Sequence, residues 1–135
     1  MKVKISDILD AMEMADRSTE FFIDQETGEL VFVNDYSMSS EEKEEIYDRL
    51  DDHGFYRLPT SFDIRDSDIM EDFVDRLSGS AHDRLSDAIS GRGAFSRFKS
   101  GIRALGIEDQ WYVFKEAAYG RKAVEWCEEN GIEYE

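Results

Sequence analysis

The stretch Ser90-Gly-Arg-Gly-Ala-Phe-Ser-Arg-Phe-Lys99 organises the rest of this 135-residue chain. Two glycines, two phenylalanines and three cations fall within these ten residues. Gly91 and Gly93 predict a break in regular structure, because glycine takes left-handed backbone conformations without steric cost. A helix is expected to resume over residues 94–105, and Gly106 is a typical residue to end it.

On that helix the cations and the apolar side chains separate. At 100° per residue, Arg92, Lys99 and Arg103 lie within about 40° of one another. The apolar stripe is displaced from them by about 100°, with Arg97 on its other flank. Its members are Phe95, Phe98, Ile102 and Leu105. We expect the stripe to be buried, which leaves the four cations as candidates for function.

The two glycines also leave the first N–H groups of this helix open to close approach by an anion, with Arg92 beside them. The candidate partner-binding or anion-binding residues are Gly91, Arg92, Gly93, Arg97, Lys99 and Arg103. The alternative is a folding role, in which the glycines form a sharp helix–helix junction and the cations pair with the chain's own carboxylates. A dinucleotide-binding loop is not indicated, because no predicted strand precedes the glycines.

The charge of the chain is strongly negative and unevenly distributed. The formal net charge is −16, from 32 acidic and 16 basic residues. Residues 84–103 carry five basic side chains and one acidic side chain, a net charge of +4. A negative protein repels nucleic acid and anionic membranes at long range, so nucleic acid is a disfavoured partner and no membrane binding is expected. An acidic protein or a phosphate-bearing ligand suits the basic segment better.

Composition predicts one folded domain over residues 1–135. Hydrophobic residues make up 41% of the chain and aromatic residues 13%, which is enough apolar area for a core. A single cysteine, Cys127, excludes an internal disulfide and is typical of a reducing compartment. The N-terminal residues lack the apolar region of a secretory signal, and no apolar run reaches membrane-spanning length. A cytoplasmic protein is therefore expected.

The remaining segments predict a mostly helical α+β fold with a small antiparallel β-hairpin sheet near the N-terminus. Two β-rich runs within residues 19–33 flank a turn at Asp24–Gly28. A capping box at Ser39–Glu42 begins a helix that runs to His53, and residues 55–59 form a short third strand. Further helices are expected at 5–15 behind Ser6, after Asp66 or Ser67, at 80–89 and at 109–130, with a terminal strand at 132–134.

No catalytic constellation is visible in the sequence. His53 and His82 are isolated, and one cysteine cannot complete a zinc site. The densest aspartate groups lack the spacing and the glycine of a calcium-binding loop. Cys127 belongs to the expected inner stripe of the last helix, with Val113, Ala117, Gly120 and Val124. We therefore expect no metal, no cofactor and no catalytic residues, although an enzyme site built from dispersed carboxylates and arginines stays an alternative.

Several segments together resemble an uncharacterised bacterial family of small acidic proteins. The central one is Gly-Arg-Gly-Ala-Phe-x-Arg-Phe-Lys at residues 91–99. The others are Asp24–Gly28, Ile69–Phe73, Trp111–Phe114 and Glu125-Trp126. The resemblance covers most of the chain. It implies a cytoplasmic bacterial protein with the basic core as its hallmark, and it implies no catalytic residues.

Two functions are compatible with the basic helix. The first is a non-enzymatic interaction or regulatory protein that binds an acidic or phosphorylated partner through Arg92, Arg97, Lys99 and Arg103. The alternative is a nucleic-acid or nucleotide-binding protein that uses the same helix, with Gly91 and Gly93 near the phosphate. If the four cations pair with the chain's own carboxylates, the folding role is favoured instead.

Overall fold

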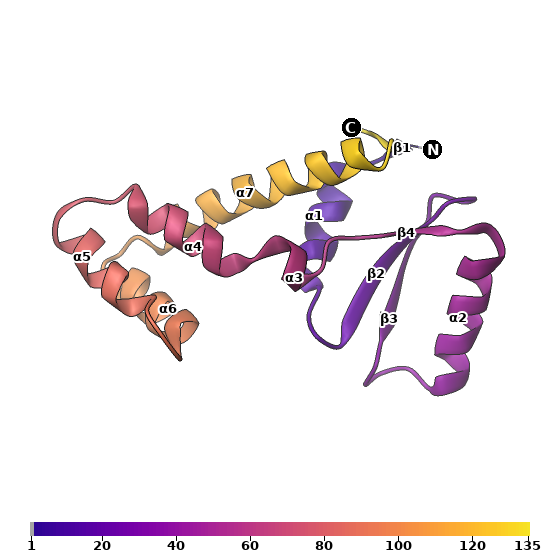
Figure 1. Cartoon of the computed structure of the whole chain (residues 1–135), viewed down its shortest axis with the longest axis horizontal. Coiled ribbons are helices and arrows are strands. Elements are labelled where there is room, and N and C mark those ends of the chain that lie inside the picture. Colours follow the sequence, from indigo (N-terminus) through magenta and orange to yellow (C-terminus); the bar gives the residue numbers. More distant parts are fainter. Residues whose placement is uncertain (1) are drawn as a thin grey trace. The chain divides into compact units, whose positions relative to one another are not determined.

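The computed structural model describes residues 2–135, except for the side chains of residues 61 and 62. It confirms a mostly helical α+β fold with a small antiparallel sheet near the N-terminus (Figure 1). The chain divides into two compact units, which we call the sheet unit (residues up to 64, with 119–135) and the helical unit (residues 65–118). The expectation of a single domain stays a prediction. Among the described residues, no helix combines the length and apolar character that a membrane span requires.

Most of the secondary structure lies where the local signals predict it. The sheet unit contains β1 (Lys2–Val3), α1 (Ile5–Met14), β2 (Thr19–Asp24), β3 (Leu30–Asn34), α2 (Ser40–His53), β4 (Phe55–Arg57), α3 (Ser61–Ile64) and β5 (Glu133–Tyr134). The helical unit contains α4 (Asp66–Asp75), α5 (Gly79–Ala88) and α6 (Ala94–Ala104). The last helix, α7 (Glu108–Glu129), contributes its first half to the helical unit and its second half to the sheet unit.

The predicted hairpin and the third strand form one antiparallel sheet with the order β3-β2-β4. Phe22 pairs with Val31 across the hairpin and with Arg57 of β4 on its other side. The expected terminal strand is present as β5. Its parallel partner β1 was not predicted, because two residues are too few to show a periodicity.

Helix α2 and helix α1 lie on opposite sides of this sheet (Figure 1). The predicted cap begins α2, because Ser39 Oγ accepts a hydrogen bond from the Glu42 N–H at 3.1 Å. Leu50 of α2 packs with Phe22 and Val33 of the sheet in a buried cluster. Burial of these side chains holds the helix against the sheet.

Asp24, at the end of β2, is the one fully buried charged side chain among the described residues. Its Oδ1 accepts hydrogen bonds from the Glu26 and Thr27 N–H groups at 2.9 and 3.2 Å. Arg49 Nε donates to Oδ2 at 3.0 Å, and His53 Nδ1 lies 2.9 Å from Oδ1. Burial by itself would raise the pKa of Asp24, but these hydrogen bonds and the His53 charge outweigh it and lower the pKa.

Two helix starts differ from the expectation. The N-cap of α1 is Lys4 and not Ser6, and the N-cap of α4 is Arg65 in a left-handed conformation (φ 57°), and not Asp66 or Ser67. Neither residue provides a side-chain cap. A polar residue near a helix start therefore marks the region of the start, while the neighbouring chain decides the residue.

The inner stripe of α7 is also different from the predicted one. Val113 is 70% exposed and Ala117 is exposed, whereas Cys127 is fully buried as expected. The buried residues of this helix are Trp111, Ala118, Tyr119, Ala123 and Cys127. Charged side chains are spread around most of α7, so its sequence marks the buried side only weakly.

Candidate partner-binding surface

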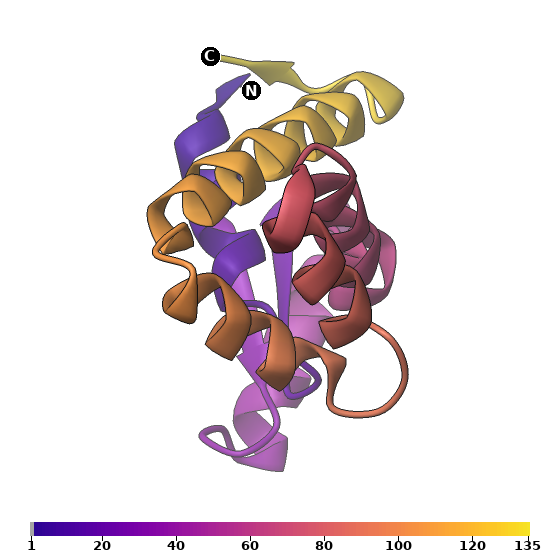
Figure 2. The ribbon, with the colours of Figure 1, turned by 90° about the vertical axis from the view of Figure 1, so that its left-hand side faces the viewer.

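The glycine pair forms the predicted junction between α5 and α6, which lie side by side (Figures 1 and 2). Gly91 and Gly93 both have left-handed backbones, with φ of 76° and 73°. Gly93 is the N-cap of α6, and no side chain caps the helix there. A Cβ atom at Gly93 would lie 3.0 Å from Nη1 of Arg97. Glycine at this position therefore permits both the turn and the approach of that guanidinium.

Arg97 connects the two sides of this junction at the surface of the protein. Its Nε donates a hydrogen bond to the Ala88 carbonyl oxygen at 3.0 Å, and its terminal nitrogens donate to the carbonyl oxygens of Ser90 and Arg92. These oxygens belong to the last residue of α5 and to the loop beyond it, where the helix provides no N–H partner. We assign Arg97 a folding role, because its guanidinium is turned toward the backbone.

We expect Arg97→Ala to lower the free energy of unfolding by about 1–2 kcal/mol, because the junction loses charge-assisted hydrogen bonds at a partly solvated site. Arg97→Lys should recover less than half of the loss, since an ammonium cannot span three carbonyl groups. Urea denaturation measures both. Arg84→Ala removes an exposed arginine of α5 as the matched control, and equal stability of the two alanine variants would exclude the folding role.

The other predicted cations have different partners. Lys99 Nζ donates to the Tyr112 hydroxyl at 2.8 Å and lies 4.8 and 5.7 Å from the ring centroids of Tyr112 and Phe95. Arg103 Nε lies 3.3 Å from Oε2 of Glu108. The Arg92 side chain has no partner among the residues that the structure describes. Of the four cations, only Arg103 pairs with a carboxylate within the described part of the chain.

The exposed side of α6 carries aromatic as well as cationic groups. Phe95 is 53% exposed, so its assignment to the buried stripe was wrong, whereas Phe98 and Ile102 are fully buried as predicted. Phe95, Lys99 and Arg103 follow one another at four-residue spacing on one side of the helix. Tyr112 of α7, 43% exposed, joins them through Lys99. We call Phe95, Lys99, Arg103 and Tyr112 the α6 face.

Sequence reasoning missed Tyr112 and Glu108, because no pattern within one helix shows which side chain of the next helix reaches it. The resemblance to a family did mark the segment that contains Tyr112. The model of the uncharacterised protein family UPF0158 matches residues 1–135. The chain belongs to this family. No curated protein and no solved structure matches it. That the glycine–arginine core is a hallmark of UPF0158 stays a prediction.

In this UPF0158 protein a hollow between α5 and α6 adds a further cation, Arg84, to the predicted set. Arg84 of α5 lines the hollow together with Ser96 and Ser100 of α6. The two helices approach closely here, because a Cβ atom at Gly101 would lie 2.7 Å from Cδ2 of Leu85. The hollow could hold a carboxylate or phosphate oxygen beside Arg84.

Metal binding and nucleophilic catalysis require other arrangements of side chains than the α6 face provides. Among residues 2–135, no three histidine, cysteine or acidic side chains converge in a way that could hold a metal ion. Cys127 is fully buried, and burial together with the charge of Glu128 raises the pKa of its thiol. A raised pKa disfavours the nucleophilic thiolate. Cys127 therefore belongs to the core.

Proposed function

We propose that this UPF0158 protein is a non-enzymatic interaction or regulatory protein that binds an acidic or phosphorylated protein segment through the α6 face and Arg92. The observation that supports this proposal is the pairing of the cations. The chain has 32 acidic residues, yet Arg92 and Lys99 have no carboxylate partner among its described residues. Their positive charge is therefore available to a partner.

The contacts of Lys99 also suit it to binding. Its ammonium is held by one hydroxyl and two aromatic rings, which orient a cation without neutralising it. A partner carboxylate or phosphate would meet a positioned charge and would not have to displace an internal ion pair. Arg103 differs, because a partner must compete with Glu108 for it.

The exposed rings favour a protein partner over a small anion. Phe95 and Tyr112 leave about half of their surfaces in solvent beside two cations. Aromatic residues and arginine are enriched in the centres of protein interfaces, where they contribute much of the binding energy. Inorganic phosphate would leave both rings unused.

The distribution of charge is compatible with an acidic partner. The helical unit has 10 acidic and 8 basic residues, a net charge of −2, whereas the sheet unit has 22 and 8, a net charge of −14. At physiological ionic strength charges beyond about 8 Å are largely screened, so the local cations decide the interaction. The helical unit is therefore the part of the chain that an acidic segment can approach.

Nucleic acid is the second candidate, and one observation favours it. The N-terminus of α6 has no side-chain cap, and Arg92 is next to it. Uncapped N–H groups and a nearby cation are suited to a phosphate group. Nucleic-acid binding would weaken steeply and linearly with the logarithm of the salt concentration.

Binding of a labelled twelve-residue polyglutamate peptide, a phosphoserine peptide and single-stranded DNA by fluorescence anisotropy tests the proposal. We expect Arg92→Glu and Lys99→Glu each to weaken peptide binding about tenfold, which corresponds to about 1.4 kcal/mol. The phosphoserine peptide should bind more tightly than its serine counterpart, since phosphorylation adds about −2 charge.

Arg121→Glu provides the matched control, because it reverses an exposed arginine of α7 outside the α6 face. It should change the affinity less than twofold. Equal affinities of the wild type, Arg92→Glu and Lys99→Glu for both peptides would exclude the proposed function. Tighter binding of DNA than of either peptide, with a steep salt dependence, would favour the nucleic-acid alternative.

A further inference from the structure

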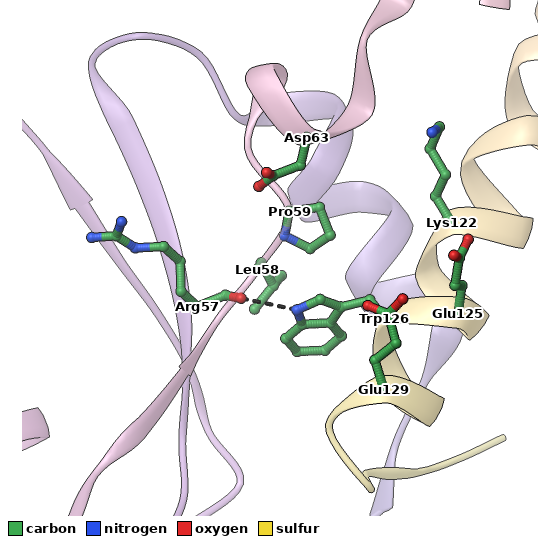
Figure 3. Close-up of a pocket in the computed structure, with 8 residues that line it drawn as sticks. All are labelled: Arg57, Leu58, Pro59, Asp63, Lys122, Glu125, Trp126 and Glu129. Carbon is green, nitrogen blue, oxygen red and sulfur yellow. Dashed lines mark hydrogen bonds between the residues drawn. The ribbon is translucent and has the colours of Figure 1, made fainter.

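The sheet unit contains a pocket of a different chemical character, between the segment after β4 and the second half of α7 (Figure 3). Pro59 and the largely buried Leu58 line one side, and Trp126 of α7 lines the pocket beside them. The Trp126 Nε1–H donates a hydrogen bond to the Arg57 carbonyl oxygen at 3.0 Å, which fixes the indole. The pocket thus has a positioned aromatic wall.

Three carboxylates also line this pocket. Asp63, Glu125 and Glu129 line the pocket (Figure 3). Asp63 already has hydrogen-bond partners, because its Oδ2 accepts hydrogen bonds from the N–H and hydroxyl of Thr60. Glu125 and Glu129, by contrast, have no hydrogen-bond or ion-pair partner among the described residues. Two carboxylates next to one indole are therefore available to a ligand.

The positive side chains that line the pocket do not neutralise these two carboxylates. Arg57 points away from Trp126 in Figure 3, and its Nη2 lies 3.5 Å from Oε2 of Glu20. Lys122 lies near Glu125 on the same helix, but no ion pair within 4.0 Å joins the two in the described part of the chain. The pocket keeps a negative character at Glu125 and Glu129.

We propose that this pocket binds the side-chain cation of a lysine or arginine from a basic segment of a partner protein. An indole face attracts an ammonium or guanidinium group, and tryptophan does so more strongly than the other aromatic residues. Glu125 and Glu129 would accept its hydrogen bonds, while Pro59 would contact its methylene groups. This site is separate from the α6 face and does not depend on the function proposed for that face.

A protein segment is the occupant that fits best, because one cation in a solvated pocket binds weakly. Surface ion pairs and exposed cation–π contacts are each weak, so a single free amine is expected to bind only in the millimolar range or more weakly. The sheet unit has a net charge of −14, which attracts a segment with several cations. One of these cations would enter the pocket while the others remain on the negative surface around it.

Titration of the full chain with octalysine, followed by acrylamide quenching of tryptophan fluorescence and by calorimetry, tests this proposal. Trp111 is 1% exposed and contributes little to quenching, so the signal reports Trp126. We expect octalysine to protect Trp126 in a saturable way. The double variant Glu125→Gln with Glu129→Gln should weaken the affinity about tenfold, because it leaves the indole in place and removes both carboxylates.

The matched control is the double variant Glu44→Gln with Glu45→Gln, which removes the same charge from exposed positions of α2. It should weaken octalysine binding less than twofold. If both double variants weakened octalysine binding equally, or if octalysine bound without protecting Trp126, the proposed cation site would be wrong and general charge attraction would explain the binding.

Titration with n-butylammonium chloride, with n-butanol at matched ionic strength as the control, distinguishes a free amine from a protein segment as the source of the cation. If n-butylammonium saturated the pocket at the same concentrations as octalysine, the proposal that the occupant is a protein segment would be wrong.

Discussion

Replacing Phe98 with alanine is expected to lower the free energy of unfolding by about 3–5 kcal/mol. Phe98 is fully buried on the inner side of α6. Its ring meets Trp111 edge-on, with ring centroids 4.8 Å apart, and meets Phe73 in the same way at 6.2 Å. The substitution removes both aromatic contacts and leaves a cavity that this cluster cannot fill by small shifts. Urea and thermal denaturation measure the loss.

Phe95→Ala is the matched control for this prediction, because it removes the same side chain from the same helix at a position that is 53% exposed. Its cost should stay below about 1 kcal/mol, as for most exposed substitutions. Lys99 also loses one of its two aromatic neighbours in this variant, so partner binding should weaken while the fold persists. Equal destabilisation by the two alanine variants would contradict the placement of Phe98 in the core and of Phe95 at the surface.

Replacing Asp24 with asparagine is expected to lower the Tm by about 10 °C at neutral pH, because Arg49 and His53 lose the buried carboxylate that they contact. Asparagine keeps the size of the side chain and can still accept the hydrogen bonds of the turn. It cannot provide a second carboxylate oxygen to the Arg49 Nε. The variant therefore isolates the charge from the shape.

The same variant should change the response of stability to acid. The folded-state pKa of Asp24 lies below the ordinary value of 3.8, so the folded state favours the ionised form. The stability that Asp24 contributes is fully present above pH 3.8 and is lost as the pH falls through the folded-state pKa. In Asp24→Asn this part of the acid dependence should disappear, and the Tm measured between neutral pH and pH 2 should decline less than in the wild type.

Asp48→Asn removes an exposed carboxylate of α2 and serves as the control for the Asp24 variant. It should leave both the Tm and its dependence on pH almost unchanged. If Asp24→Asn showed the same acid dependence as the wild type, the buried ion pair would not contribute to acid stability, and the role that we assign to it would be wrong.

The two proposed surfaces differ in charge and in the way the chain prepares them. On the α6 face, Lys99 is positioned by the hydroxyl and the ring of Tyr112, and the proposed partner is acidic. In the Trp126 pocket, Glu125 and Glu129 border an indole that is fixed by its own hydrogen bond. The charge-reversal and glutamine variants test the two proposed surfaces separately.

Local chemistry was enough to predict much of the fold from the sequence. The turn between β2 and β3, the Ser39 cap of α2 and the break at Gly91 and Gly93 depend on residues within a few positions of one another. Such signals act through backbone conformation and nearby hydrogen bonds, which neighbouring residues determine. The basic segment at residues 84–103, with its five cations, follows directly from the composition.

Only the tertiary structure decided which side chains are buried and which cations are available. The exposure of Phe95, the buried side of α7 and the burial of Asp24 depend on elements that are distant in sequence. The same holds for the partner of Lys99, because Tyr112 belongs to another helix. The sequence by itself determined where the helices other than the short α3, the hairpin and the positive segment lie. Packing between those elements decided that Arg97 is held by the backbone and that Lys99 contacts a hydroxyl and not a carboxylate, since burial and pairing are properties of contacts between elements.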